Sequence, residues 1–301
     1  MRKFFHTARE SLVACGFPTH IAAMHAAITI GRPILMRALS YLPLALLVSA
    51  SPAMAQQADD LSLTYGIHIG GVHVLDANAD MALGPDGYRA GLKMETDGFL
   101  GRVAQWKTDV RAQGHLTGPL PRPRQFTAHG SWRDQPRLTT VDYTPDGTPT
   151  LTLANPEPEK DREPVPADLR LGTVDPVSAI VAVLDQVAKK GDCDITVPVY
   201  DGRQRYDLIF ATQGPATLEA TDLSVYAGPA TACSVKYKPL AGRWKENRQR
   251  DRDREGAKRK DVPVTLYIAP AIAGGPPVPV RLEMDSPLGA VKVHLASVKA
   301  G

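Results

Sequence analysis

Cysteine is scarce in this sequence, and recognisable catalytic or metal-binding motifs are lacking. Only three cysteines occur among 301 residues. No cysteine or carboxylate lies at zinc-ligand spacing from the histidines, so the sequence does not predict a zinc site. No G-x-S-x-G motif marks a hydrolase nucleophile, and no glycine-rich loop has a phosphate-binding fingerprint. The sequence therefore identifies no reaction, and we expect no cofactor and no metal.

The balance of residue types excludes several classes of protein. Aromatic residues make up only 6% of the chain, charged residues 22% and hydrophobic residues 43%. These values exclude a chain that is disordered throughout, a collagen and a membrane protein with many spans. They are typical of a globular protein with one large or two small domains.

A stretch without charge lies early in the chain, from Ala38 to Ala55. It follows Arg37, has an apolar centre at 42–48 and ends in Ala53-Met54-Ala55. A basic start, an apolar centre and a small-x-small end are typical of a secretory signal peptide and its cleavage site.

We therefore expect residues 36–55 to be a signal peptide that is cleaved near Ala55, and residues 1–35 to result from an over-long start assignment. The alternative is a membrane anchor, but the stretch is short for a full span and contains Pro43 and Pro52. The expected mature protein is periplasmic or secreted.

Cleavage at this point would change the net charge. The chain carries 35 basic and 32 acidic residues, of which five basic and one acidic precede residue 56, so that 30 basic and 31 acidic residues remain. A nearly neutral mature chain gives no support to nucleic-acid binding.

Two cysteines, Cys193 and Cys233, follow the expected signal peptide. In an oxidising compartment the simplest prediction is one disulfide between them, which would stabilise the fold by about 3 to 4 kcal/mol through chain entropy. Two free thiols or a redox-active pair are the alternatives, although a redox pair usually has C-x-x-C spacing.

Apolar and polar residues alternate with a period of two through much of the remaining chain, which is typical of half-buried strands. Turn-forming sequences such as Pro85-Asp86-Gly87 and Pro145-Asp146-Gly147 separate them. The pattern predicts about a dozen strands in one mainly β domain over residues 56–301. We expect a curved antiparallel sheet or a partly open β-barrel.

One segment has helical spacing instead. Asp175 is a good N-cap, Pro176 suits the first helical position, and Gly191 suits the end, so a helix is predicted at about 176–190. Its apolar face includes Val177, Ile180, Val181 and Leu184. We expect these residues to be buried against the concave face of the sheet, where they either fill the core or line an apolar cavity.

Two stretches of biased composition are expected at the surface. Residues 155–166 are rich in proline and charge and predict a solvated linker loop. Residues 243–260 hold nine basic and four acidic residues, a balance that could contact lipid phosphates at a membrane surface. The alternative for this basic stretch is a solvated loop with i,i+4 pairs such as Glu246 with Arg250.

A hairpin is predicted where Asp201-Gly202 turns the chain between two strands. Arg203 would lie at its tip, and with Arg205 it could bind a carboxylate or phosphate group through forked hydrogen bonds. The alternative is that both arginines pair with Asp201, Asp207 or backbone carbonyls and stabilise the hairpin itself.

The histidines give weaker evidence for a functional site than the hairpin does. His68, His73, His115, His129 and His294 follow the expected signal peptide, and we expect ordinary surface or core positions for all five. His68 and His73 are five residues apart, so on one continuous strand they would face opposite sides, although Gly70-Gly71 could bend the chain between them.

The helix start, the two cysteines and the hairpin follow one another in a characteristic order along the chain. Gly172-Thr173-Val174-Asp175-Pro176 opens the helix, Cys193 follows, and the hairpin Tyr200-Asp201-Gly202-Arg203-x-Arg205-Tyr206-Asp207-Leu208 precedes Cys233. This order resembles the bacterial secreted family known as domain of unknown function 3108. The resemblance implies an exported, β-rich envelope protein and assigns no catalytic residue. It carries over the cysteine pair and the signature residues Asp201, Gly202, Arg203, Arg205 and Tyr206.

The expected function rests on analogy at the level of the fold. A curved sheet around a helix leaves an apolar concavity, so we expect non-catalytic binding of an apolar or amphipathic envelope molecule such as a lipid. The alternative is a structural or assembly factor of the envelope that acts through protein contacts, using the basic stretch or an open sheet edge. A hydrolase would need paired carboxylates in a cleft, and the spacing of Asp201 and Asp207 does not predict one.

Overall fold

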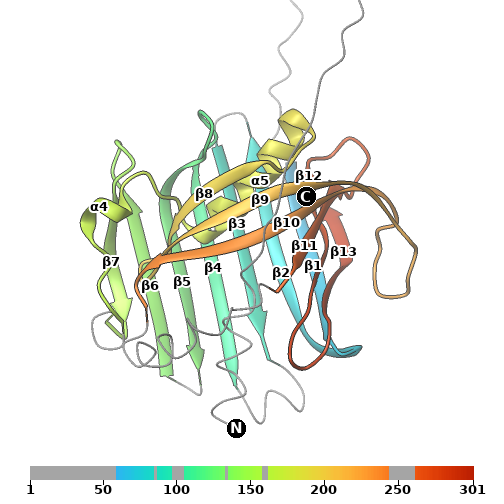
Figure 1. The fold of residues 1–301 in the computed structure, drawn as a ribbon, viewed down its shortest axis with the longest axis horizontal. Coiled ribbons are helices and arrows are strands. Elements are labelled where there is room, and N and C mark those ends of the chain that lie inside the picture. Colours follow the sequence, from blue (N-terminus) through green and yellow to red (C-terminus); the bar gives the residue numbers. More distant parts are fainter. Residues whose placement is uncertain (1–58, 85–86, 97–104, 133–134, 158–161, 244–261) are drawn as a thin grey trace, which may run out of the picture. The chain divides into compact units, whose positions relative to one another are not determined.

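Thirteen antiparallel strands form one continuous sheet in the computed structural model, which describes residues 59–84, 87–96, 105–132, 135–157, 162–243 and 262–301 (Figure 1). The strands are β1 (Asp59–Ile69), β2 (Val72–Gly84), β3 (Gly87–Glu95), β4 (Trp106–His115), β5 (Arg122–Trp132), β6 (Gln135–Tyr143), β7 (Pro149–Asn155), β8 (Ile195–Tyr200), β9 (Arg205–Leu218), β10 (Gly228–Ala241), β11 (Val264–Pro270), β12 (Pro277–Met284) and β13 (Val291–Ala300). Two short helices, α4 (Ala167–Arg170) and α5 (Pro176–Lys190), accompany them.

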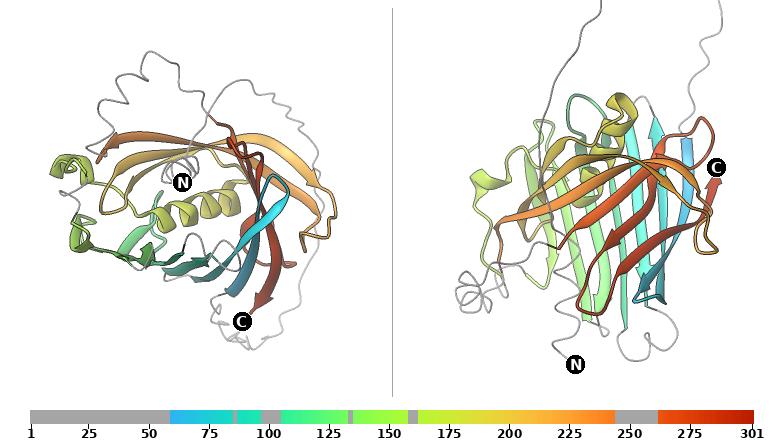
Figure 2. Two further views of the ribbon diagram at one scale, coloured as in Figure 1. Left: turned by 90° about the horizontal axis from the view of Figure 1, so that it is seen from below. Right: turned by 45° about the vertical axis from the view of Figure 1, so that its right-hand side comes forward.

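The sheet curls into a nearly closed barrel with one seam. Its strand order is β7-β6-β5-β4-β3-β2-β1-β13-β12-β11-β10-β9-β8, so β7 and β8 are the two edges and β1 pairs with β13 in the middle. The curve is plain in the two views of Figure 2. The predicted mainly β class and partly open barrel are confirmed.

Alternation along the strands separates the inside of the barrel from the outside. In β1, Leu61 and Leu63 are buried in the core, whereas Ser62 between them points outward and donates a hydrogen bond to Asp80 of β2 (3.0 Å). Successive side chains of a strand face opposite sides of a sheet. The alternation of apolar and polar residues in the sequence therefore reflects one sheet face that packs in the core and one that contacts water.

Helix α5 lies inside the curve of the sheet (Figure 2, left). Its N-cap is Asp175, whose side chain accepts a hydrogen bond from Ser178 N (2.8 Å), and it ends at Gly191, which has a φ of 75° and donates to Val187 O (2.9 Å). The predicted helix and both of its end signals are confirmed.

The helix joins two hydrophobic clusters of the core. Val183 belongs to the larger cluster, with Val278 and Val280 of β12. Val181 belongs to the second cluster, with Phe126 of β5 and Val141 of β6. Because both clusters include α5, the helix packs against the two halves of the barrel at once.

The proline-rich stretch 155–166 differs from the expected solvated loop where it is described. Arg162 is 2% exposed and Val165 is 4% exposed. Arg162 Nη1 donates to Gly242 O (2.9 Å), and Glu163 N donates to the carbonyl of the next residue, Arg243 (2.9 Å). These bonds anchor the stretch to the end of β10, a distant contact that a composition of proline and charge does not reveal.

Several predictions lie outside the described residues. These are the over-long start, the signal peptide and, apart from Arg243, the basic stretch 243–260. None of the helices within the described ranges combines the length and the hydrophobicity that a membrane span requires.

Candidate functional site

The signature turn lies between β8 and β9, at one edge of the barrel seam. Asp201 Oδ1 accepts hydrogen bonds from the backbone N–H groups of Arg203 (2.8 Å) and Gln204 (2.6 Å), which closes the turn. Burial raises the pKa of the Asp201 carboxyl, while these two N–H bonds and the positive charges of Arg162 and Arg203 act in the opposite direction. A carboxylate that accepts these backbone hydrogen bonds stabilises the turn conformation.

Gly202 brings this turn into contact with the opposite edge of the sheet. Its φ is +85°, and a Cβ atom added to it would lie 2.5 Å from Thr139 Cγ2 and 3.0 Å from Leu151 Cδ1. Thr139 belongs to β6 and Leu151 to β7. Only a residue without a side chain fits this position, because both the backbone conformation and the space require glycine.

Arg203 crosses the seam next to this contact. Its Nε atom donates to Thr139 Oγ1 (3.3 Å) and its Nη2 atom donates to Leu138 O (3.3 Å). Arg203 and Gly202 therefore connect the β8–β9 turn to β6 although more than sixty residues separate them in the sequence.

Arg205 is held within its own hairpin and by α4. Its Nη1 atom donates to Asp207 Oδ1 (2.7 Å) and to Tyr206 O (2.6 Å), and its Nε atom donates to Leu169 O (3.0 Å). Arg205 thus makes carbonyl and carboxylate contacts within its hairpin and with α4, as the stabilising alternative describes, whereas Arg203 donates to a hydroxyl and a carbonyl of β6. Tyr206 lies in the core, with its ring 4.7 Å from that of Tyr237.

The segment that precedes α5 covers the free edge of β8. Val174 N donates to Pro198 O (2.9 Å), Tyr200 N donates to Val174 O (2.9 Å), and these bonds form a parallel bridge between Val174 and Val199. Two motifs that are separate in the sequence, the helix start and the hairpin, therefore meet on β8 at the seam.

A buried polar group ties the start of α5 to β3. Tyr88 of β3 shares a hydrogen bond with Ser178 (hydroxyl oxygens 2.5 Å apart), and Ser178 Oγ donates to the Asp175 carboxylate. Asp175 is fully buried. Burial raises its pKa from 3.8 to about 6, although the hydrogen bonds from Ser178 act in the opposite direction.

Replacing Asp175 with asparagine is expected to change how stability depends on pH. Because the pKa of Asp175 is raised on folding, the folded state binds its proton more tightly, so the contribution of this residue becomes less favourable as pH rises from about 4 to 6. Asparagine is an equally good N-cap and does not titrate. Between pH 4 and pH 7, the free energy of unfolding of Asp175→Asn should gain roughly 2 kcal/mol relative to the wild type. Urea unfolding at both pH values measures this difference, and a difference independent of pH would contradict it.

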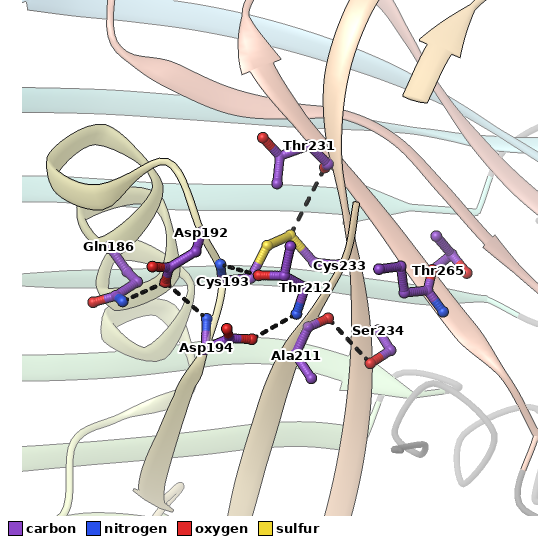
Figure 3. The surroundings of a disulfide bond; sticks show 11 residues. Gln186, Asp192, Cys193, Asp194, Ala211, Thr212, Thr231, Cys233, Ser234 and Thr265 are labelled. Carbon is purple, nitrogen blue, oxygen red and sulfur yellow. Dashed lines mark hydrogen bonds between the residues drawn. A yellow bond between two sulfur atoms is a disulfide. The ribbon is translucent and has the colours of Figure 1, made fainter. Parts of the chain in front are cut away.

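The disulfide ties the end of α5 to the other half of the barrel (Figure 3). Cys193, two residues after Gly191, is bonded to Cys233 of β10 with a Cα–Cα distance of 5.9 Å. Neither residue is exposed. Cys193 N also donates to Thr212 Oγ1 of β9 (2.8 Å). The bond suggests an oxidising, extracytoplasmic environment.

An apolar row on the concave face is less completely covered than the row beside it. Ala79, Leu92, Val110 and Ala128 lie opposite one another on β2, β3, β4 and β5, and we refer to these four residues as the open inner row. All four are only half-buried. In the adjacent row, Phe126 is 2% exposed and packs in the same cluster as Val181 of α5. The four residues pack against the margins of the two core clusters and keep part of their surface accessible.

The four helix residues considered for a cavity wall all contact the core. Leu184 and Ile180 pack with the larger cluster, and Val181 and Val177 pack with the second. Val181 and Leu184 are 2% exposed, while Val177 and Ile180 are half-buried.

Sequence reasoning missed the residues that receive the signature turn. Thr139 and Leu151 carry no motif, and only the sheet order places them beside Gly202. Within the part of the chain that the structure describes, no three histidine, cysteine, aspartate or glutamate side chains are arranged to hold a metal ion.

Comparison with known proteins gives a family but no activity. No curated protein matches the chain. One similar solved structure is the crystal structure of a β-barrel-like protein of domain of unknown function DUF1849 from Brucella abortus, with 11% identity, a TM-score of 0.47 and coverage of 81% of this chain and 99% of that chain. The family model described as protein of unknown function (DUF3108) matches residues 63–296, which include the helix, the hairpin and both bonded cysteines. The chain therefore belongs to the DUF3108 family.

Proposed function

We propose that this chain is an exported, non-catalytic binding protein that holds an apolar or amphipathic envelope molecule on the concave face of its barrel. The observation that supports this function is the open inner row. Its four side chains are apolar and half-buried, whereas the adjacent row is packed under α5. Covering such a strip is favourable by about 25 cal/mol for each Å² removed from water.

The shape of the open inner row favours a linear apolar group. Adjacent strands lie about 4.8 Å apart, so a row that crosses four strands is about 14 Å long and one side chain wide. An acyl chain laid across β2 to β5 would match this strip. Its polar end would then remain at the rim of the sheet, in contact with water.

The carboxylates considered for hydrolysis are already engaged. Asp201 accepts two backbone hydrogen bonds within its turn, and Asp207 accepts one from Arg205. Binding is therefore the better-supported function, and the disulfide supports its location in an oxidising compartment.

Protein purified from the periplasm in mild buffer is expected to carry lipid, which native mass spectrometry and organic extraction would detect. Leu92→Glu should reduce the bound lipid about tenfold or more, because covering an unpaired carboxylate with an apolar chain costs several kcal/mol. Val72→Glu is the matched control, since Val72 is 68% exposed and lies outside the row. Thermal unfolding would show that both variants remain folded. Wild-type protein free of lipid, or equal loss in the two variants, would contradict the proposed function.

A structural or assembly role is the second candidate, and the β7 edge favours it. Within the described residues β7 pairs only with β6, and Leu153 on this strand is 40% exposed. Leu169 and Leu171, at α4, are also exposed. An edge strand with apolar side chains can accept a strand from another protein. A photo-crosslinker at Leu153 that captured one envelope protein, together with lipid-free barrel, would favour this candidate.

A further inference from the structure

A small cavity lies on the outer face of the barrel, away from the concave face. Its volume is about 200 Å³. The residues that line it include His68, Gly70, Gly71, Leu223, Lys292 and His294. Ligand pockets for drug-sized molecules have volumes of about 300 to 1,000 Å³, so this cavity fits a compact chemical group.

Strand pairing brings the polar side chains of this cavity together. His294 of β13 lies opposite Gly66 of β1 on one side and Arg281 of β12 on the other. His68 of β1 lies opposite Lys292 in the same way. The rings of His68 and His294 are 5.7 Å apart between centroids. The cluster therefore spans three neighbouring strands and takes its residues from both ends of the described chain.

Both histidines are buried although they lie on the outer face. His68 is 9% exposed and His294 is 4% exposed. The loop between β9 and β10 crosses this region, since Val225 N donates to the carbonyl of Leu295 (2.9 Å) and Leu223 lines the cavity. The loop therefore lies beside the two imidazole rings.

Several buried polar atoms at this place lack a partner. Among the described residues, Nδ1 of His68, Nδ1 of His294, and Nε and Nη2 of Arg281 are buried without a hydrogen bond. Leaving such an atom unpaired costs about 1 to 3 kcal/mol, and more for a charged group. Native proteins rarely tolerate several such atoms together unless a further group satisfies them.

The unpaired N–H groups of Arg281 need acceptors, and each histidine Nδ1 can donate when it carries a proton. Arg281 and Lys292 are cations, and the Glu283 carboxylate lies 3.8 Å from Arg281 Nη1 and 3.7 Å from Lys292 Nζ. The nearby Asp76 carboxylate is already bonded to His73 (2.8 Å). A cation at this place would be repelled, whereas an oxyanion would satisfy the donors.

We propose that this cavity binds the carboxylate or phosphate group of a small anionic molecule. Lys292 and the ring N–H groups of His68 and His294 donate to its oxygens, and Arg281 adds positive charge from the next strand. Gly70 and Gly71 keep the entrance free of side chains, and Leu223 covers the bound group. This binding does not depend on the concave face.

The protonation of His294 should respond to the bound group. Burial lowers its pKa, and the positive charges of Arg281, His68 and Lys292 lower it further, while Glu283 acts in the opposite direction. A bound anion adds an opposing charge and stabilises the protonated ring. The pKa of His294 should therefore rise on binding. His73 of β2 lies on the far side of His68 from His294.

The test is a titration of the purified protein with inorganic phosphate and, separately, with acetate, followed through the histidine Cε1–H signals by NMR. We expect saturable shifts of His68 and His294 with at least one anion, and no shift of His115 or His129, which are exposed on other strands. The two arms distinguish a phosphate ligand from a carboxylate ligand. Absence of a saturable shift with both anions, or shifts that appear with Zn²⁺ alone, would overturn the proposal.

Paired variants show whether the shifts come from this cavity. Lys292→Gln should weaken anion binding about tenfold. Lys299→Gln should leave it unchanged, because Lys299 lies on the same strand opposite Ser62, away from the histidines. Both lysines are exposed, so neither substitution threatens folding. Equal affinities in the two variants would also overturn the proposal.

Discussion

Gly202→Ala is expected to lower the free energy of unfolding by about 2 to 5 kcal/mol, the sum of a left-handed backbone cost and an overpacking cost. The φ of +85° accounts for the first cost, and the Cβ position 2.5 Å from Thr139 Cγ2 accounts for the second. Because Gly202 joins the two edges of the sheet, the loss should be accompanied by faster hydrogen exchange in β6 and β7. Urea unfolding and hydrogen exchange measure both effects.

Gly147→Ala separates the two costs. Gly147 has nearly the same backbone conformation, with a φ of +86°, but an added Cβ atom would meet nothing within 4 Å. This variant should lose only the backbone cost, about 1 to 2 kcal/mol. Adding Thr139→Ser to Gly202→Ala removes the clashing methyl group, keeps the hydroxyl that Arg203 contacts, and should restore part of the stability. Equal losses for the two glycine variants would show that the seam contact contributes nothing.

Removing the disulfide should have an effect of similar size. The double variant Cys193→Ala with Cys233→Ala is expected to lose about 2 to 4 kcal/mol of unfolding free energy, because the unfolded chain regains the freedom of a loop of some forty residues. The substituted side chains are fully buried, so the small cavities that they leave add to the loss. Urea unfolding of the variant and the oxidised wild type gives the difference.

Reduced wild-type protein is the matched control for that experiment. Once its disulfide is reduced in denaturant, it should unfold at a lower urea concentration than the oxidised protein and at a slightly higher one than the double variant, because its thiol side chains leave no cavities. Alkylation in denaturant without reductant should modify neither of these cysteines in protein taken from the periplasm. Modification of both under those conditions would show that the bond does not form in the cell, and the inferred compartment would then have to be abandoned.

Local features of the sequence predicted local features of the fold well. Asp175, Pro176 and Gly191 act on the backbone within one turn of the helix, and each has the role that its residue type predicts. The alternation of apolar and polar residues likewise predicted strands, since it depends only on which side of a sheet each residue faces. These signals need no knowledge of distant contacts.

Contacts across the barrel could not be predicted in this way. Asp201-Gly202 indicated a turn, but the receiving surface at Thr139 is visible only when the sheet order is known. Arg162 shows the same limit, because its burial depends on a carbonyl at the end of β10. The signature residues are therefore identifiable from sequence, whereas their joining of two sheet edges is not.

The histidines illustrate a different limit. Counting residues on one strand places His68 and His73 on opposite faces, but the chain turns at Gly70-Gly71 and a bulge in β2 brings the two rings 5.2 Å apart. His294 joins them through the pairing of β1 with β13. No spacing rule connects residues 68 and 294, so the outer cavity could emerge only from the three-dimensional structure.

The pairing of β1 with β13 also governs the order in which the molecule can assemble. Leu61 lies opposite Ala300, so β1 has no neighbour on one side until β13 has joined it. Contacts between such distant segments slow folding and prolong the lifetime of incomplete intermediates. Until β13 pairs with it, β1 would present an unsatisfied backbone edge, and a chaperone that holds the incompletely folded chain would be suited to mask it.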